Sequence, residues 1–174
     1  MINVPKRRRR EGKTDYKHRK RMLKGEKARV LFKKTNKRII GQYVISKESQ
    51  DYVIITANSG ELLAMGWPKE WEGSLKSLPA AYLTGLLLGK KIKDNDKTNN
   101  EGVLDLGLYR NVKKSRIYAY AKGIIDAGIK MPVNEKMFPD KERIEGMHMK
   151  KDVKEVIEKI TKKLGAKKWL KKKK

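Results

Sequence analysis

The sequence contains no cysteine, and this absence excludes several classes of chemistry at once. Without a thiol there is no disulfide, no thiolate metal site and no cysteine nucleophile, which is compatible with a reducing cytosol. Long apolar runs are missing too, because the longest, residues 79–89, is far shorter than the ~20 residues that a membrane span needs. The basic start does not lead into the apolar segment of a signal peptide. We therefore expect a soluble cytoplasmic protein with no membrane role.

Acidic residues are also scarce. The chain has 20 Asp and Glu against 45 Lys and Arg, which gives a formal net charge of +25 on 174 residues. The basic excess runs over the whole length and is densest in residues 6–10 and 13–21. Like charges at this density repel one another unless a polyanion neutralises them, and phosphate fits the guanidinium group best. The composition therefore predicts a protein that binds nucleic acid on several sides.

The motifs that would support an enzyme are missing. There is no Gly-rich loop ending in Gly-Lys-Ser or Gly-Lys-Thr, and no cluster with metal-ligand spacing. The two histidines, His18 and His148, lie far apart, so we interpret them as surface or RNA-facing side chains. Asp105 falls in an expected strand, where a buried structural acceptor is a simpler interpretation than a catalytic acid. We expect no catalytic site, no cofactor and no metal.

Changes in composition divide the chain into three parts. Residues 1–27 have almost no spaced apolar positions, so we expect a basic RNA-binding arm that is extended or only locally helical when unbound. Residues 28–131 hold most of the periodic apolar segments and predict one mixed α/β core domain that binds RNA. Residues 132–174 comprise a surface segment, an amphipathic helix and a Lys-rich tail.

The first half of the core domain favours β-structure. Residues 28–34 and 37–45 are rich in strand formers, and Thr35 and Asn36 between them favour a hairpin turn. A third strand at residues 51–57 follows a polar turn. The simplest pairing of these segments is a meander of three antiparallel strands.

Helices alternate with strands after that point. Residues 79–91 predict a helix that Pro79 opens, followed by a polar loop at 93–102. A further strand is expected at 103–109 and a second helix at 115–129, where apolar residues recur every three to four positions. A strand followed by a helix, twice, places the helices against the sheet in a mixed α/β layer.

Two glycines and two tyrosines allow more than one interpretation. Gly85 and Gly89 lie four residues apart on one face of the first helix, which favours close packing of that face against the sheet over a role in ligand binding. Tyr118 and Tyr120 lie on the second helix, where a place in the core is at least as plausible as stacking on RNA bases.

The C-terminal part contains the clearest amphipathic pattern. After Pro132 we expect an irregular surface segment. Val153, Val156, Ile157, Ile160 and Leu164 then form one apolar stripe, Asp152 suits the N-terminal dipole of a helix, and Gly165 suits its end. In the tail, Trp169 and Leu170 are the only groups that could serve as anchors.

Four blocks of sequence resemble one known family, in the same order. The blocks are RRRREGKTDYKHRKRMLK at 7–24, PAAYLTGLLLGKK at 79–91, LDLGLYRNVKKSRIYAYAKGIIDAGI at 104–129 and MFPDKERIEGMHM at 137–149. They resemble universal ribosomal protein eighteen, the 5S-rRNA-binding protein of the large ribosomal subunit, in its archaeal and eukaryotic branch. The compact length is similar to that of archaeal members.

The resemblance implies a fold and a role. The fold has three antiparallel strands, a helix, a further strand and a helix, in agreement with the order inferred above. The role is structural: the protein would hold 5S rRNA in the central protuberance, join it to 23S rRNA, and contact neighbouring large-subunit ribosomal proteins. The RNA contacts carried over by position are Arg7, Arg8, Arg9, Arg10, Lys13, Thr14, Tyr16, Arg19, Arg21, Lys33, Lys34, Asn36, Lys37, Arg110, Lys113, Lys114 and Arg116.

Two other classes of function remain open on composition alone. A non-ribosomal protein associated with tRNA or DNA would have the same basic excess, and duplex DNA should then compete as well as 5S rRNA does. An RNA-processing enzyme would need a constellation of titratable groups, which the sequence does not contain.

Overall fold

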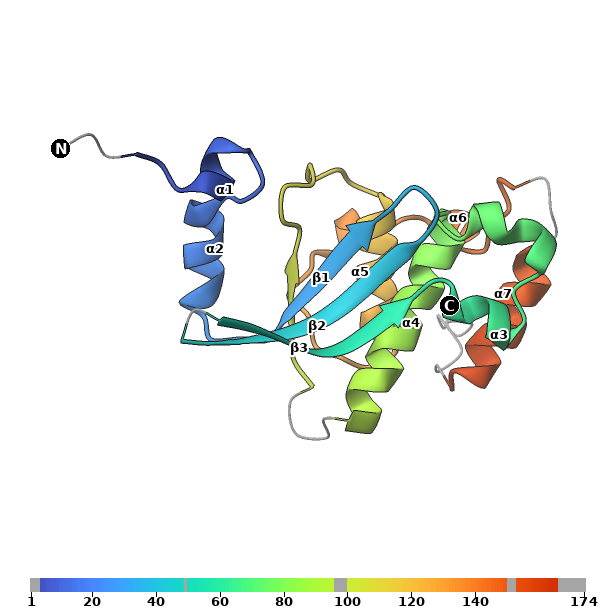
Figure 1. The fold of residues 1–174 in the computed structure, drawn as a ribbon. Helices are drawn as coiled ribbons and strands as arrows, with labels where there is room; N and C mark the ends of the chain where they lie inside the picture. Colours follow the sequence, from blue (N-terminus) through green and yellow to red (C-terminus); the bar gives the residue numbers. More distant parts are fainter. Residues whose placement is uncertain (1–3, 49, 96–99, 150–152, 166–174) are drawn as a thin grey trace.

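The computed structural model describes residues 4–48, 50–95, 100–149 and 153–165. A four-stranded sheet with the order β3-β2-β1-β4 forms its centre, and α4 and α5 pack against the sheet (Figure 1). The strands are β1 (Arg29–Lys34), β2 (Ile39–Lys47), β3 (Gln50–Asn58) and β4 (Val103–Asp105). The helices are α1 (Arg7–Arg10), α2 (Tyr16–Leu23), α3 (Glu61–Met65), α4 (Leu78–Asn95), α5 (Arg116–Asp126), α6 (Lys141–Ile144) and α7 (Val153–Lys163), with 3-10 helices at η1 (Lys69–Ser74) and η2 (Glu135–Met137).

The predicted meander of three antiparallel strands is confirmed. β2 pairs antiparallel with β1 on one side and with β3 on the other, with one irregularity next to Tyr43. Successive side chains of a strand point to opposite faces. Accordingly, Val30 and Phe32 are buried, whereas Lys33 between Phe32 and the turn is exposed.

The fourth strand is shorter than predicted. The sequence favoured a strand over residues 103–109, but only Val103–Asp105 is a strand, and it pairs parallel with β1. The reason is local, because the Asp105 carboxylate accepts a hydrogen bond from the backbone N–H of Gly107 at 2.9 Å. Gly107 has a positive φ of 56°, so the chain leaves the sheet in a turn.

Both predicted core helices are confirmed, with changed bounds: α4 is longer than the predicted 79–91, and α5 ends at Asp126, before the predicted end at 129. α4 continues to Asn95, so the start of the expected loop at 93–102 is helical, whereas residues 96–99 lie outside the described part. Pro79 is buried in the first turn of α4, although Leu78 is the first helical residue.

The expected partner of the small-residue face of α4 was wrong. Gly85 lies against the backbone of α5, where a β-carbon would overlap the carbonyl oxygen of Tyr120. In turn, a β-carbon on Gly123 would overlap the carbonyl oxygen of Tyr82. Close packing therefore joins helix to helix, whereas we expected helix to sheet, and α4 and α5 act as one unit against the strands.

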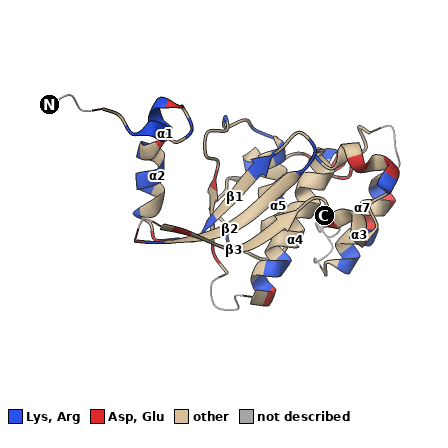
Figure 2. Cartoon of the chain, in the orientation of Figure 1, with Lys and Arg blue, Asp and Glu red and all other residues tan. Residues whose placement is uncertain are grey.

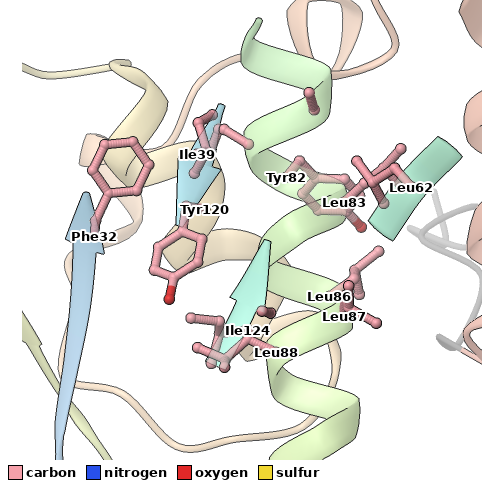
Figure 3. Close-up of a cluster of buried hydrophobic side chains, with 14 of the residues drawn as sticks. Phe32, Ile39, Leu62, Tyr82, Leu83, Leu86, Leu87, Leu88, Tyr120 and Ile124 are labelled. Atoms are coloured by element: carbon pink, nitrogen blue, oxygen red, sulfur yellow. The ribbon is translucent and has the colours of Figure 1, made fainter. Parts of the chain in front are cut away.

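The two tyrosines of α5 belong to the core. Tyr120 is fully buried beside Phe32 of β1, with 5.4 Å between ring centroids, and its hydroxyl donates to the carbonyl oxygen of Leu31 at 3.2 Å. Figure 3 shows this ring among side chains from β1, β2, α3, α4 and α5. Tyr118 is buried as well, and its hydroxyl donates to the Asn111 side chain.

The C-terminal part joins the same core. The segment after Pro132, which we expected to be irregular, contains η2 and α6, and Pro139 within it is buried. The stripe predicted for the last helix is confirmed, since α7 buries Val153, Ile157 and Ile160. Asp152 and the tail after Gly165, with Trp169 and Leu170, lie outside the described residues.

The N-terminal arm forms two short helices, consistent with a locally helical segment. Asp15 caps α2, because its carboxylate accepts from the N–H groups of Lys17 and His18 at 2.9 and 3.0 Å. α2 has no buried residue and stands beside the long β2–β3 hairpin, away from α7 (Figure 1). No helix in the described ranges has the length and apolar character of a membrane span.

Candidate nucleic-acid interface

Lysine and arginine residues are concentrated in the three segments that were predicted to contact RNA. Figure 2 shows basic residues on α1 and α2, on the strand ends at the β1–β2 turn, and on the chain that leads into α5. Nearly all of the predicted contacts are exposed, whereas Thr14, Tyr16 and Arg19 are half-buried. The exposed set is Arg7, Arg8, Arg9, Arg10, Lys13, Arg21, Lys33, Lys34, Asn36, Lys37, Arg110, Lys113, Lys114 and Arg116.

Contacts within the arm arrange part of this charge. Arg8 donates from Nε to the Thr14 hydroxyl at 2.9 Å, so Thr14 orients an arginine in the unbound protein. The ammonium of Lys6 lies 4.8 Å from the centre of the Tyr16 ring and covers one of its faces. Arg9 and Arg10 form no ion pair within the described residues, and their guanidinium groups are available to phosphate.

A chain of charged groups connects the arm to the sheet. Arg19 on α2 donates to Asp51 on β3 at 2.8 Å, and Asp51 also accepts from Arg29 on β1 at 2.6 Å. Arg29 donates in addition to Asp105 on β4 at 2.9 Å. The Arg29 side chain is only 4% exposed, so two carboxylates from different strands compensate one buried cation.

This network has a clear electrostatic effect on Asp51. Partial burial alone would raise the pKa of its carboxyl group, but hydrogen bonds from Arg19, Ser46 and Arg29 outweigh burial and hold that pKa well below its ordinary value. Asp51 is therefore a carboxylate at neutral pH. The interpretation of Asp105 as a buried structural acceptor is confirmed, because it is 7% exposed and pairs with Arg29.

The turn after β4 lies between the arm and the hairpin tip. Leu108 lines a hollow together with Arg9, Thr14 and Tyr16 of the arm. The next residue, Tyr109, accepts at its hydroxyl from the N–H of Lys34 at 3.1 Å, at the end of β1. The three basic segments, which are distant in the sequence, therefore meet around this one turn.

A cleft opens beside Tyr109 and contains residues from two of the predicted segments. Its volume is about 540 Å³, and Lys34, Lys114 and Arg116 all contribute to its lining. Lys114 has a positive φ of 57°, and its Nζ pairs with Asp140 at 2.9 Å. Thus the backbone of Lys114 forms the turn that precedes α5, and its side chain pairs with the segment before α6.

Other predicted contacts lie outside this cleft. Arg110 and Lys113 are exposed on the chain between the turn and α5, but they do not line the cleft. At the hairpin tip, the carbonyl oxygen of Asn36 accepts from Nζ of Lys76 at 2.9 Å. Lys33 and Lys37 are exposed near the same tip, which extends the basic surface beyond the cleft.

Sequence reasoning missed several residues of this region. Arg143 lines the cleft from the 137–149 block, together with His148, which the sequence analysis had interpreted as a surface or RNA-facing side chain, and Lys76 reaches the hairpin tip. That block carried the family resemblance, but no regular spacing singled out its basic residues. Arg29 was missed as well, because the sequence around an arginine at the start of an apolar strand does not show whether its side chain is buried or exposed.

Comparisons with known proteins agree with this picture. The model of the family described as "Ribosomal large subunit proteins 60S L5, and 50S L18" matches residues 2–102. The chain belongs to the uL18 family. The large ribosomal subunit protein uL18 of Korarchaeum cryptofilum is 47% identical over 143 residues, which cover 82% of this chain and 70% of the relative. As a member of the uL18 family the chain is a structural component of the large ribosomal subunit and has no enzymatic role.

Two further archaeal relatives support the same assignment. The uL18 protein of Methanococcus maripaludis is 43% identical over 150 residues, with 86% of this chain and 74% of the relative covered. The uL18 protein of Methanothrix thermoacetophila is 44% identical over 143 residues, with 82% of this chain and 81% of the relative covered. These matches extend to most of the uL18 chain and support the archaeal character expected from its length.

Proposed function

We propose that this uL18 chain binds 5S rRNA and anchors it to 23S rRNA in the central protuberance of the large ribosomal subunit. The observation that carries the proposal is the meeting of the three basic segments around Leu108 and Tyr109. Basic segments that meet at one turn can follow a folded RNA backbone better than separate patches can. The proposed contacts are the residues inferred in the sequence analysis, together with Lys76 and Arg143.

The proposed mechanism is scaffolding by charge neutralisation and shape. Arg9 and Arg10 would contact phosphates from the arm, while Lys34 and Arg116 would contact a second stretch of backbone. Because the Arg19–Asp51 contact already places α2 beside the sheet, less conformational entropy is lost when RNA binds. Sequence preference would come from bases that are unpaired in the folded rRNA, where aromatic side chains can reach them.

The bridging role requires that two RNAs bind at once. The arm projects on one side of the sheet, whereas basic residues of α7 lie at the other end of the molecule and basic residues of α4 lie at the end of that helix away from the arm (Figure 2). This distribution supports separate contacts with 5S rRNA and 23S rRNA. Other large-subunit proteins would then complete the neighbourhood of the assembled particle.

A tethering assay tests this role. A 23S rRNA fragment from the central protuberance is immobilised, and labelled 5S rRNA is added with or without the protein. We expect retention of 5S rRNA to depend on the protein and to fall when Arg9 and Arg10 are changed to Gln. Retention of tRNA to the same extent as 5S rRNA would overturn the proposal.

A further inference from the structure

The cleft beside Tyr109 has an apolar floor and a cationic rim. Phe32 and Ile117, both buried, contribute to the floor. Lys34, Arg116 and Arg143 contribute to the rim, and they form no ion pair with any acidic residue in the described ranges. The volume of about 540 Å³ falls within the range of pockets that hold small organic ligands, roughly 300–1,000 Å³.

We propose that this cleft holds one unpaired nucleotide of the bound RNA, with the base inside and its flanking phosphates on the rim. The proposal rests on the RNA binding proposed above and assigns it a specific recognition site. Apolar and aromatic walls suit the face of a base, and guanidinium and ammonium groups suit the phosphates on either side. Double-stranded RNA offers no such group, because its bases are stacked within the helix.

Tyr109 is held as a fixed stacking surface. Its hydroxyl accepts from the Lys34 N–H and donates to the Lys34 carbonyl oxygen at 3.4 Å. The Phe32 ring packs against it in a T-shaped arrangement, with 6.0 Å between centroids and 70° between planes. The residue nevertheless remains 42% exposed. A ring that is held by its hydroxyl and by a neighbouring ring, and is still exposed, loses little conformational freedom when a base stacks on it.

Ser115 lies in the wall of the same cleft. It is the residue before α5, but its hydroxyl makes no capping hydrogen bond. The Ser115 Oγ atom is buried and has no partner among the described residues, although it belongs to the cleft lining.

An acidic peptide is the main competing occupant. Its carboxylates would suit the rim, but it would leave the aromatic surface of Tyr109 without a planar partner. Three of the residues that line the cleft, Lys34, Lys114 and Arg116, also belong to the basic surface proposed to contact RNA. Continuity with that surface favours a nucleotide over a peptide.

Affinity measurements on matched variants test the proposal. The full chain is titrated with 5S rRNA and, separately, with a short single-stranded RNA. Tyr109→Ala removes the stacking surface, and its control is Tyr52→Ala, since Tyr52 is 50% exposed on β3 and does not line the cleft. We expect Tyr109→Ala to weaken binding of both RNAs about tenfold or more, and Tyr109→Phe to stay within about threefold of wild type.

A second pair of variants does not disturb the core. Val112 in the cleft lining and Val53 on β3 are 53% and 50% exposed, so Val112→Asp and Val53→Asp make the same charge change at two exposed sites. We expect Val112→Asp to weaken RNA binding more than Val53→Asp does, because only Val112 lines the cleft. Equal effects of both changes, together with wild-type affinity for Tyr109→Ala, would overturn the cleft proposal.

Crosslinking separates this proposal from the proposed function. RNA that carries 5-iodouridine at its unpaired positions should crosslink to the segment that contains Tyr109, and an Asp-rich peptide in excess should not prevent it. Crosslinks confined to the arm would overturn the cleft site while leaving 5S binding intact. If 5S rRNA binds no better than tRNA, the proposed function fails, and the single-stranded RNA still decides whether the cleft holds a nucleotide.

Discussion

The Arg19 guanidinium on α2 donates a hydrogen bond to the Asp51 carboxylate on β3, with 2.8 Å between Nη1 and Oδ2. Asp51 accepts in addition from the buried Arg29, so the charged arm and the interior of the sheet share one carboxylate. This contact therefore places α2 of the arm beside the sheet in the absence of RNA. A ribosomal protein with such an arm loses less entropy on assembly than one whose basic tail is fully disordered.

Removal of Arg19 and removal of Asp51 should lower the stability of the protein by different amounts. Arg19→Ala removes a half-exposed partner, and we expect a loss of about 0.2–1 kcal/mol in unfolding free energy together with faster proteolysis of the arm. Asp51→Ala leaves the buried Arg29 with one carboxylate, and we expect a loss of about 1–3 kcal/mol. Urea unfolding of both variants measures the difference, with Lys20→Ala as the surface control. Equal losses for the two variants would contradict the network.

The network also predicts how stability depends on pH. The pKa of Asp51 is lowered in the folded protein from a reference of 3.8, so its contribution to stability is complete above that value. The contribution is lost as pH falls through the lowered pKa. The stability difference between wild type and Asp51→Asn should therefore stay constant near neutral pH and shrink below about pH 4. Chemical unfolding at several pH values measures this difference, and a difference that does not shrink in acid argues against the ion pairs.

Contact between the backbones of α4 and α5 predicts a strong effect at Gly85. A β-carbon at this position would overlap the carbonyl oxygen of Tyr120, and the backbone of a buried helix cannot move without loss of packing. We expect Gly85→Ala to cost about 1–3 kcal/mol of unfolding free energy. Gly73→Ala is the matched control, because a β-carbon there meets nothing within 4 Å. Thermal or urea unfolding that shows the same stability for both variants would exclude close packing at Gly85.

The free arginines of the arm predict a change in salt dependence. Arg9→Gln and Arg10→Gln should each flatten the log–log dependence of RNA affinity on salt by about 0.7–0.9, one lost phosphate contact at a time. Both residues are exposed on α1 and contribute nothing to the core, so unfolding should be unchanged. Lys69→Gln on η1 is the control, because Lys69 is exposed and is not one of the proposed RNA contacts. An unchanged slope for the arm variants would remove α1 from the interface.

Local patterns in the sequence were sufficient for much of the fold. Alternation around Val30 and Phe32 predicted the first strand, and the stripe through Ile157 and Ile160 predicted the last helix. The fourth strand was predicted too long because its end depends on a side chain: the Asp105 carboxylate turns the chain at Gly107. Apolar patterning carries no information about such a turn.

The candidate site depends on contacts between distant segments, and these were harder to predict. The basic runs were visible in the composition, but the cleft required residues near Lys34, Ser115 and Arg143 to come together in the fold. The partner of Gly85 was also unpredictable, since a small residue indicates close approach without showing which element approaches. In the sequence Arg29 cannot be distinguished from a surface cation, because its two carboxylate partners come from other strands.

The most direct test of the account is the affinity of the full chain for 5S rRNA, measured by electrophoretic mobility at two salt concentrations with tRNA and duplex DNA as competitors in excess. We expect tight binding that persists against both competitors, with an affinity that falls as salt rises because phosphate contacts release counterions. Displacement by tRNA or duplex DNA at concentrations similar to that of 5S rRNA would show a nonspecific polycation and would contradict the proposed recognition of 5S rRNA.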